Sequence, residues 1–383
     1  MLAEDVRSPL ALPPWDNASM DGYAVRASDV RGASKAQAVR LRVVGTIAAG
    51  EGGSRHVGPG EAIRIMTGAP VPKGADSVVR VEDTDGGTEN VQLFADRDSL
   101  RNVRPRGEDL TTGDTAVASG TPLGPAHLGL LAAVGRAEVR VHRRARVAVL
   151  ASGDELVDVD RFDEVLAGTK IVTSNSYSLH AAVREAGGVP VPLGVVRDDP
   201  AALRERLAGC DCDFLLTTGG VSVGAFDHTR PVMAELGLTP RFWRVRIRPG
   251  GPIAFGSLRG TPWLGLPGNP VSTLVTFELF ARPALRRMHG LALPFRRPVR
   301  VRVAEAVTIG APLVHFLRAA IVDGDDGPVA RLTGPQGSGL LTSMARADAL
   351  LIVPPTRMRI EPGEFVDALM LRDDVAYAAA PPV

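Results

Sequence analysis

The residues best suited to chemistry stand in one glycine- and serine-rich segment in the middle of the chain. The apolar run 214–216 predicts a buried strand that ends at Thr217-Thr218. A strand that gives way to a glycine loop and then a helix is a common anion site of open α/β sheets. A hydroxyl and a carboxylate in the loop add ligands for an anion and for a divalent cation. The residues concerned are Gly219, Gly220, Ser222, Gly224 and Asp227.

Several other predicted strands end in residues of the same kind. Strands at 146–152, 191–196 and 214–218 alternate with helices, which indicates a mainly parallel sheet with ligand loops at its carboxyl ends. Asp199-Pro200 is typical of an N-cap and first helical residue, which leaves Asp198 as the freer carboxylate. Carboxylates on one rim would repel one another unless a cation such as Mg²⁺ joined them. The further residues expected at this rim are Ser152, Glu155, Asp198, Pro267, Gly268, Asn269 and Pro270.

Three arginines follow in the segment 241–249, which is predicted to be a strand. Alternation along a strand would place Arg244, Arg246 and Arg248 on one face. Three arginines on one face need either solvent or an anionic partner. Both interpretations stay open at this point.

Composition describes a globular protein without a nucleic-acid or membrane signature. The 383 residues fit two or three domains, and the formal net charge is +1. The N-terminal segment lacks the basic and apolar regions of a signal peptide, and no apolar run is long enough to span a bilayer. Cys210 and Cys212 are expected to be small residues at the start of a strand. These observations predict a cytoplasmic protein with no membrane or nucleic-acid partner.

The pattern of strands and helices predicts a multidomain α/β plus β chain. A small β-rich domain over 13–111 is inserted in a linking part formed by 1–12 and 112–145. A central α/β domain with a mainly parallel sheet covers 146–290. A C-terminal β barrel or sandwich covers 294–372.

The segment 13–25 is rich in turn formers, yet it contains side chains that ordinarily seek burial. They are Trp15, Met20 and Tyr23. A polar loop anchored by aromatic residues is a candidate functional segment. The compact loop 66–72 and the charged turn 102–110 belong to the same predicted domain.

Six motifs, in this order, resemble one known family. They are DNASMDGYA, IRIMTGAPVP, ASGDEL, TSNSYSL, TTGGVSVGAFD and GLPGNPVS. Together they resemble the bacterial molybdopterin molybdenumtransferases of the MoeA type, the family of the gephyrin E domain. The resemblance runs from about Ser8 to the C-terminus.

The resemblance implies an activity, a set of ligands and a set of residues. A family member inserts molybdate into adenylylated molybdopterin and releases AMP, with Mg²⁺ at the acidic rim. It implies an elongated homodimer, with a molybdopterin adenylyltransferase and apo-molybdoenzymes as candidate partners. By position, the catalytic residues would be Asp21, Thr67, Asp109, Glu155, Asp198 and Asp227, with Glu155, Asp198 and Asp227 as metal ligands. Arg244, Arg248 and Ser343, or a hydroxyl neighbouring Ser343, would join the rim residues in substrate binding.

The chain departs from the family pattern at a few positions, and alternatives follow from them. The family usually has Lys at the positions of Arg244, Arg248 and Gly251, and often Glu at that of Ala225. A diverged, non-catalytic molybdopterin-binding or scaffold paralogue is therefore one alternative. A molybdopterin adenylyltransferase is another, argued against by the extra β domains. Residues 220–224 also match the G-x-S-x-G elbow of hydrolases, with Ser222 as nucleophile, although the helix starts too late for an elbow.

Overall fold

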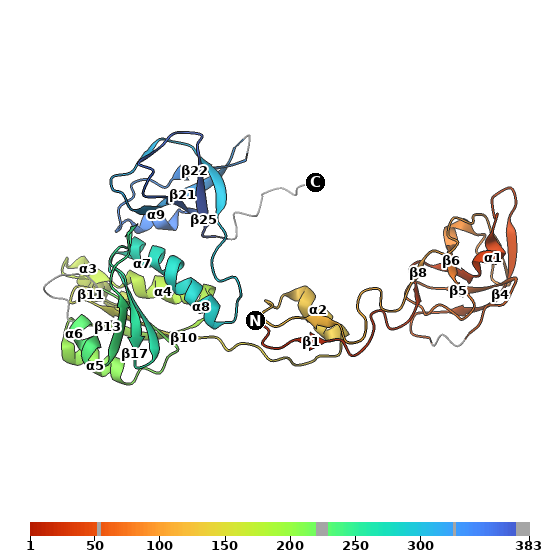
Figure 1. The fold of residues 1–383 in the computed structure, drawn as a ribbon, viewed down its shortest axis with the longest axis horizontal. Coiled ribbons are helices and arrows are strands. Elements are labelled where there is room, and N and C mark those ends of the chain that lie inside the picture. The colour runs from red at the N-terminus through yellow and green to blue at the C-terminus, as the bar shows by residue number, and fades with distance from the viewer. Residues whose placement is uncertain (52–54, 220–228, 325–326, 373–383) are drawn as a thin grey trace. The chain divides into compact units, whose positions relative to one another are not determined.

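The computed structural model describes residues 1–51, 55–219, 229–324 and 327–372 of the chain. The chain divides into two compact units, Met1–Val141 and His142–Val383 (Figure 1). The finer division into four domains stays a prediction, although separate clusters of buried apolar side chains occur within each unit. None of the helices in the described ranges has the length and apolar character needed to cross a membrane.

A five-stranded sheet forms the β-rich part of the first unit. Its strand order is β6-β3-β5-β4-β7, in which β4 and β5 run parallel and the other pairs antiparallel. Alternate residues of β3 enter two apolar clusters, one on each face, so this strand is buried on both sides. The elements are β2 (Asn17–Ala18), β3 (Gly22–Val25), α1 (Ala27–Val30), β4 (Val39–Ile47), β5 (Glu61–Ile65), β6 (Ser77–Arg80), a 3₁₀ turn (Val81–Asp83), β7 (Asn90–Leu93) and β8 (Val103–Arg104).

The segment 13–25 is only partly the anchored loop that the sequence predicts. It supplies the central strand β3, and Tyr23 is fully buried there, whereas Trp15 is 50% exposed and Met20 36%. A Cβ atom on Gly22 would lie 2.0 Å from the carbonyl oxygen of Val79, so the neighbouring strand fits only against glycine. The three large side chains suggested that the whole segment is anchored, whereas of the three the Tyr23 ring alone is buried and fixes it.

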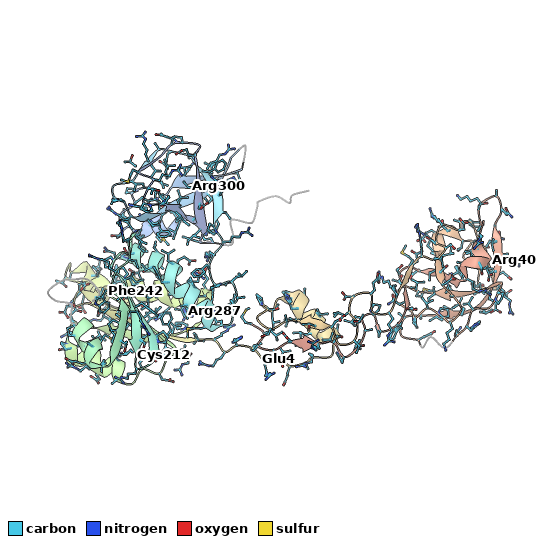
Figure 2. All side chains as sticks on the ribbon, in the orientation of Figure 1. Glu4, Arg40, Cys212, Phe242, Arg287 and Arg300 are labelled. Carbon is cyan, nitrogen blue, oxygen red and sulfur yellow. The ribbon has the colours of Figure 1, made fainter. Side chains whose placement is uncertain are left out.

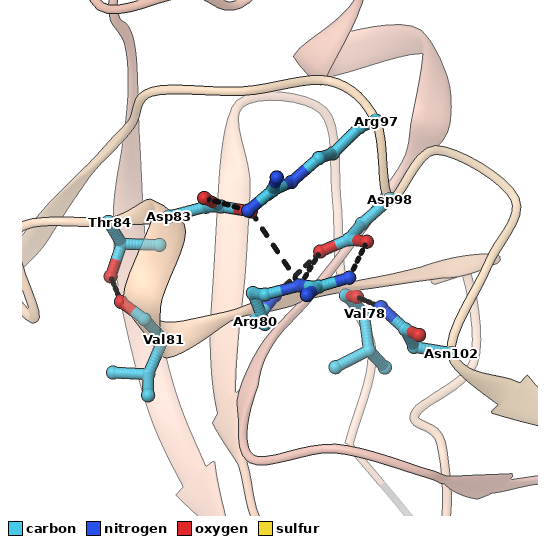
Figure 3. A network of polar contacts seen from close by, with 8 residues as sticks. All are labelled: Val78, Arg80, Val81, Asp83, Thr84, Arg97, Asp98 and Asn102. Carbon is cyan, nitrogen blue, oxygen red and sulfur yellow. Dashed lines mark hydrogen bonds and ion pairs between the residues drawn. The ribbon is translucent and has the colours of Figure 1, made fainter.

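A polar network holds the segment that returns from this sheet (Figure 3). The guanidinium of Arg80 donates two hydrogen bonds of 3.0 Å to the buried carboxylate of Asp98. Arg97 pairs with Asp83 through bonds of 2.8 and 2.6 Å, and the Asn102 amide donates to the carbonyl of Val78. Two-point guanidinium–carboxylate pairs fix orientation as well as distance. The network therefore ties the loop 94–102 to the end of β6.

The remainder of the first unit is a small linking part. Strand β1 (Val6–Arg7) pairs antiparallel with β9 (Thr115–Val117), and helix α2 (Pro125–Ala133) packs beside them. Proline at the first turn of α2 suits a position whose N–H has no helical partner. The buried core of this part contains Leu2, Val6, Val117, Leu131 and Val134.

A six-stranded mixed sheet lies at the centre of the second unit, and the prediction of an α/β domain with a mainly parallel sheet is confirmed. The order is β13-β10-β14-β18-β17-β15; the pairings among the first four strands are parallel, and the pairings β18–β17 and β17–β15 are antiparallel. Helices cover both faces, α4 with α7 and α8 on one and α5 with α6 on the other. The strands are β10 (Arg146–Ser152), β13 (Val189–Val196), β14 (Phe214–Thr218), β15 (Leu238–Phe242), β17 (Ala254–Leu258) and β18 (Thr261–Leu266).

Helix boundaries follow local sequence signals closely. Pro200 begins α5 (Pro200–Ala208), and the Asp199 carboxylate accepts a hydrogen bond of 2.7 Å from the N–H of Ala202, so the predicted cap is confirmed. The other elements of this domain are β11 (Leu156–Val157), a 3₁₀ turn (Val159–Arg161), α3 (Phe162–Leu166), β12 (Ile171–Val172), α4 (Ser174–Glu185), α6 (Thr229–Glu235), α7 (Pro270–Thr276), a π-helical turn (Phe277–Ala281) and α8 (Arg282–Met288).

The two cysteines pack at the start of β14, as expected. Cys210 and Cys212 are free thiols whose sulfur atoms lie 3.4 Å apart, and both pack against the cluster under α5 and α6 (Figure 2). Burial raises the pKa of the Cys212 thiol to about 12. The described residues contain no group of three or more His, Cys, Asp and Glu side chains that could hold a metal ion.

The C-terminal part of the second unit is a closed five-stranded β barrel, which confirms the predicted β architecture. Closure comes from the pairing of β21 with β23, and the barrel order is β21-β22-β19-β25-β23. The short strand β16 (Ile247–Arg248), from the segment that follows β15, adds to β21 in parallel. The elements are β19 (Val299–Val303), β20 (Val307–Thr308), β21 (Val314–Gly324), β22 (Gly327–Leu332), α9 (Leu341–Ala345), β23 (Ala349–Val353), β24 (Arg359–Ile360) and β25 (Phe365–Met370).

A buried cluster of ion pairs connects the π-helical turn between α7 and α8 with the segment that leads into the barrel. Glu278 lies in the π-helical turn with its side chain 6% exposed, and its carboxylate pairs with Arg282 at 2.6 Å and also with Arg296. Arg296 in turn donates to the carbonyl oxygen of Leu371, the residue that follows β25. Glu185 pairs with Arg282 from outside the cluster, with its side chain 59% exposed.

We predict that Glu278→Ala lowers the free energy of unfolding by about 3 kcal/mol or more, because two guanidinium groups lose their buried counter-charge. The matched variant Glu185→Ala removes an exposed carboxylate from the same arginine and should cost about 1 kcal/mol or less. Urea unfolding followed by fluorescence of Trp243 and Trp263 measures both. Equal, small losses would contradict the assignment of Glu278 as the centre of the cluster.

Candidate functional site

A polar cavity of about 550 Å³ opens at the carboxyl ends of the parallel strands. The strands β10, β14 and β18 are neighbours, so the residues that follow them converge at one edge of the sheet. Six of the residues predicted for this rim line the cavity: Ser152, Glu155, Gly219, Gly268, Asn269 and Pro270. Gly220, Ser222, Gly224 and Asp227, also predicted for it, lie outside the described residues.

Gly219 marks the point where two of these strand ends come closest. Its backbone has φ of +86°, and a Cβ atom there would lie 2.5 Å from the carbonyl oxygen of Ser152. A larger residue would meet both a steric clash and a conformation that L side chains rarely adopt. Glycine is therefore required at 219 for β10 and β14 to end side by side at the cavity.

Asn175, at the start of α4, belongs to this cavity, although the sequence analysis names it only within the motif TSNSYSL and not among the site residues. Its amide nitrogen donates to the hydroxyl of Thr218 at 2.9 Å and to the carbonyl oxygen of Gly268 at 2.8 Å. It thereby joins the ends of β14 and β18. The signal was present in the motif TSNSYSL, whose polar residues exceed what a cap requires.

Two buried oxygen atoms of this cavity have no hydrogen-bond partner among the described residues. They are the hydroxyl oxygen of Ser152 and the amide oxygen of Asn175. A buried polar atom without a partner is unfavourable, and such atoms are uncommon in native proteins. The cavity is also lined by hydroxyl, amide and carboxylate side chains, so it is chemically suited to a polar ligand.

The three predicted metal ligands are only partly described. Glu155 is exposed and lines the cavity, and its carboxylate folds over Gly153, whose built Cβ atom would lie 2.6 Å from it. Asp198 follows β13, and its N–H donates to the carboxylate of Asp154 at 3.3 Å. Asp227 lies outside the described residues. Among the described residues the Glu155 carboxylate lines the cavity together with Ser152 and Asn175, and oxygen ligands of these types are the kind that Mg²⁺ takes.

A second cavity, of about 780 Å³, is lined by the three arginines. The predicted strand over 241–249 is wrong as a single element: β15 ends at Phe242, and only Ile247–Arg248 pair again, in a different sheet. The chain leaves the central sheet here to join the barrel, which periodicity alone could not show. Arg244, Arg246 and Arg248 nevertheless face the same cavity. Its other lining residues include Gly251, Asn269, Ser272, Gln336, Gly337 and Ser338.

Behind this cavity a buried arginine organises the loop that carries Gln336, Gly337 and Ser338. Arg318, on β21, is fully buried, and its guanidinium donates to the carbonyl oxygens of Pro335 at 3.0 Å and Gly337 at 3.1 Å. Burial lowers the pKa of Arg318. Sequence reasoning missed Arg318 because nothing in an alternating strand distinguishes an inward arginine from an outward one.

Ser343, predicted as substrate-binding, is placed against Arg318. Its hydroxyl accepts a hydrogen bond of 3.0 Å from the Arg318 guanidinium and bonds the hydroxyl of Thr333 at 2.7 Å. Within the described part of the chain it lines neither of the two cavities. Ser338, a neighbouring hydroxyl in the same loop, lines the arginine cavity instead.

In the first unit, Asp21 and Thr67 come together as a pair. The Asp21 carboxylate accepts hydrogen bonds from the hydroxyl of Thr67 at 2.6 Å and from its N–H at 2.7 Å. The hydroxyl and then the N–H hold the pKa of Asp21 below its ordinary value. Asp109 lies farther along this unit, where its N–H donates to the carbonyl oxygen of Leu12. The two exposed loops thus present one fixed carboxylate.

The fold and its two cavities define a class of protein. A β-rich region comes first, then an α/β domain whose glycine-containing loop edge suits a phosphate group, and then a β barrel. Family models match the whole of this arrangement. Residues 1–135 match the MoeA N-terminal region (domains I and II), 148–287 the probable molybdopterin-binding domain, and 300–371 the MoeA C-terminal region (domain IV).

The chain belongs to the MoeA family of molybdopterin molybdenumtransferases. It is 40% identical over 371 residues to molybdopterin molybdenumtransferase 2 of Mycobacterium tuberculosis, covering 95% of this chain and 90% of that one. It is 37% identical over 380 residues to the molybdopterin molybdenumtransferase of a Nostoc strain, covering 97% and 86%. A crystal structure of the molybdopterin biosynthesis MoeA protein of Pyrococcus horikoshii matches with a TM-score of 0.83 at 28% identity, covering 96% and 91%.

We predict that Thr67→Val raises the pKa of Asp21 toward its ordinary value, because the stronger of its two hydrogen bonds is lost. A carboxyl group with a lowered pKa stabilises the folded protein at neutral pH, and this stabilisation is lost as the pH falls through that pKa. The stability of the variant should therefore depend less on acid pH at this site. NMR titration of side-chain carboxyl carbons measures the shift. Thr111→Val is a matched control, since Thr111 bonds Asp114 in the same way; it should move Asp114 and leave Asp21 unchanged. An unmoved Asp21 in Thr67→Val would show that the hydroxyl is not the cause.

Proposed function

We propose that this chain is the molybdopterin molybdenumtransferase itself, which inserts molybdate into adenylylated molybdopterin and releases AMP. The observation that carries the proposal is the adjacency of two chemically different cavities that share Asn269. One has the glycine turn and polar edge that suit a phosphate-bearing ligand, and the other has three arginines that suit an oxyanion. The reaction needs both ligands at once.

In this proposal the rim at the sheet edge holds the adenylylated substrate. Ser152, Asn175 and Pro270 would line the bound ligand, and the lack of side chains at Gly219 and Gly268 would allow it to approach the backbone closely. Glu155, Asp198 and Asp227 would hold Mg²⁺, which supplies positive charge at the phosphate that leaves. The resemblance assigns Asp21, Thr67 and Asp109 to the same reaction.

Arg244, Arg246 and Arg248 would bind molybdate in the second cavity. A guanidinium can hold an oxyanion at two points, and it keeps its charge at every working pH. Arg244 and Arg248 replace family lysines, and Arg246 places a further positive charge in the cavity that Gly251 lines. The metal insertion then needs orientation of molybdate beside the dithiolene thiols and no protein nucleophile.

The decisive assay follows AMP release from adenylylated molybdopterin by the purified protein, with molybdate and Mg²⁺. Release that depends on molybdate, with cofactor delivered to an apo-molybdoenzyme, supports the transferase. Tight binding without release would support the diverged scaffold paralogue instead. If the protein neither binds the substrate nor releases AMP, its relationship to the family would extend to ancestry and fold only.

We predict that Arg248→Ala raises the molybdate concentration for half-maximal AMP release about tenfold or more, since a charged hydrogen bond to the oxyanion is lost. Arg248→Lys should recover part of the loss because it keeps the charge. Arg241→Ala is the matched control, since Arg241 is an exposed arginine of the same segment outside the cavity lining. An unchanged molybdate dependence in Arg248→Ala would remove the arginine cavity from the proposal.

We also propose a homodimer in the cytoplasm, with a molybdopterin adenylyltransferase supplying the substrate and apo-molybdoenzymes accepting the product. Support for the dimer comes from apolar side chains of the β11–α3–β12 region and the start of α4, which are between 48% and 77% exposed. Apolar side chains gathered on an exposed surface are typical of protein interfaces. They are Val159, Phe162, Leu166, Ile171 and Tyr177.

We predict that Leu166→Asp converts the protein to monomers, because a carboxylate would be buried without a partner in the interface. Light scattering coupled to size-exclusion chromatography distinguishes the mass of one 40.3 kDa chain from twice that mass. Leu293→Asp places the same charge at a side chain that is 81% exposed in the segment before the barrel, and should leave the dimer intact. A Leu166→Asp protein that stays dimeric would exclude this surface.

A further inference from the structure

Asn269 lies at the junction of the two cavities. Among the described residues it is the one that lines both the polar cavity at the sheet edge and the arginine cavity. It follows Gly268 at the end of the turn after β18 and precedes α7. A residue in this position contacts whatever fills either cavity.

On the side of the sheet edge, the turn before Asn269 is fixed by three hydrogen bonds. The Asn175 amide donates to the carbonyl oxygen of Gly268 at 2.8 Å. The hydroxyls of Thr218 and Thr273 donate to the carbonyl oxygen of Pro267 at 3.2 and 2.6 Å. Asn175 and Thr218 themselves line the polar cavity, so a ligand there contacts the groups that hold this turn.

On the side of the arginine cavity, the same turn is fixed to the barrel loop. The Asn269 amide nitrogen donates to the hydroxyl of Ser338 at 3.0 Å, and the N–H of Val271 donates to the carbonyl oxygen of Ser338 at 3.0 Å. The loop that carries Ser338 is in turn held by the buried guanidinium of Arg318. A displacement of the loop by an oxyanion would therefore be transmitted to the turn at 267–269.

The side chain of Asn269 gives up a local hydrogen bond to make this link. Asn269 occupies the N-cap position of α7, where asparagine is among the preferred residues, yet its side chain makes no capping bond. A residue that departs from its local preference is expected where another constraint outweighs it. Here the side chain is directed to Ser338, to which its amide nitrogen donates.

We propose that Asn269 is a positioning residue that couples the two cavities, so that an oxyanion in the arginine cavity strengthens binding of the nucleotide part of the substrate at the sheet edge, and the reverse. The inference rests on the proposed function for the identity of the two ligands. Thermodynamic linkage requires the coupling to be reciprocal. It would favour the state in which both substrates are present before AMP leaves.

The test measures binding of AMP by calorimetry, with and without saturating molybdate. In the natural protein molybdate should tighten AMP binding about fivefold or more, and AMP should tighten molybdate binding by the same factor. Asn269→Ala should bring this ratio close to one. Ser338→Ala should do likewise, and the double variant should lose no more than either single one, because both remove the same bond.

Glu155→Gln is the matched control. It changes a side chain that lines the polar cavity but belongs neither to the turn at 267–269 nor to the barrel loop, so any effect on AMP binding should leave the ratio unchanged. An unchanged ratio in Asn269→Ala, or a ratio of one in the natural protein, would overturn the coupling. Failure of the proposed function would look different, because AMP release would then be absent or independent of molybdate in the natural protein itself.

Discussion

Parallel pairing of β10, β14 and β18 is the constraint on which the rest of the second unit depends. The register places Ala151 beside Thr218, and Thr218 beside Leu266, so three strands end at the same level. Parallel strands require crossover connections, and here the helices on both faces provide them and bury the central strand β14 on both sides. The turns at the carboxyl ends are what remains accessible, and the polar cavity lies there.

The second unit also depends on the path by which the chain leaves this sheet after β15. After β15 the segment 243–252 departs from the central sheet, contributes β16 to the barrel sheet and returns as β17, so one stretch of chain belongs to both domains of this unit. The arginines lie on that stretch. The buried cluster formed by α7, β21 and β23 packs the two domains together beside it. The arginine cavity is thus a product of domain packing, with lining residues from both.

Much of the fold was accessible from sequence because its signals are local. Strand β14 and the cap at Asp199 needed only periodicity and residue preference. The cavity lining was accessible where it depends on strand ends, as at Ser152 and Gly219. It was missed where it depends on contacts distant in sequence: Asn175 reaches Gly268 across 93 positions. The strand predicted at the arginines failed for the same reason, since the barrel that captures β16 is formed by residues that come much later.

Several residues of the two cavities are locally unfavourable. Gly219 adopts a positive φ, the Asn269 side chain makes no cap bond to its helix, and the buried Ser152 hydroxyl oxygen has no partner among the described residues. Arg318 is also locally unfavourable, because carbonyl oxygens stabilise a buried guanidinium less than a carboxylate does. The stability that tolerates these features comes from the apolar layers on both faces of the sheet and the barrel interior. Backbone strain and unpaired polar atoms lie together at one edge of the sheet, away from those apolar layers. Binding of two polar ligands there would be expected to relieve both.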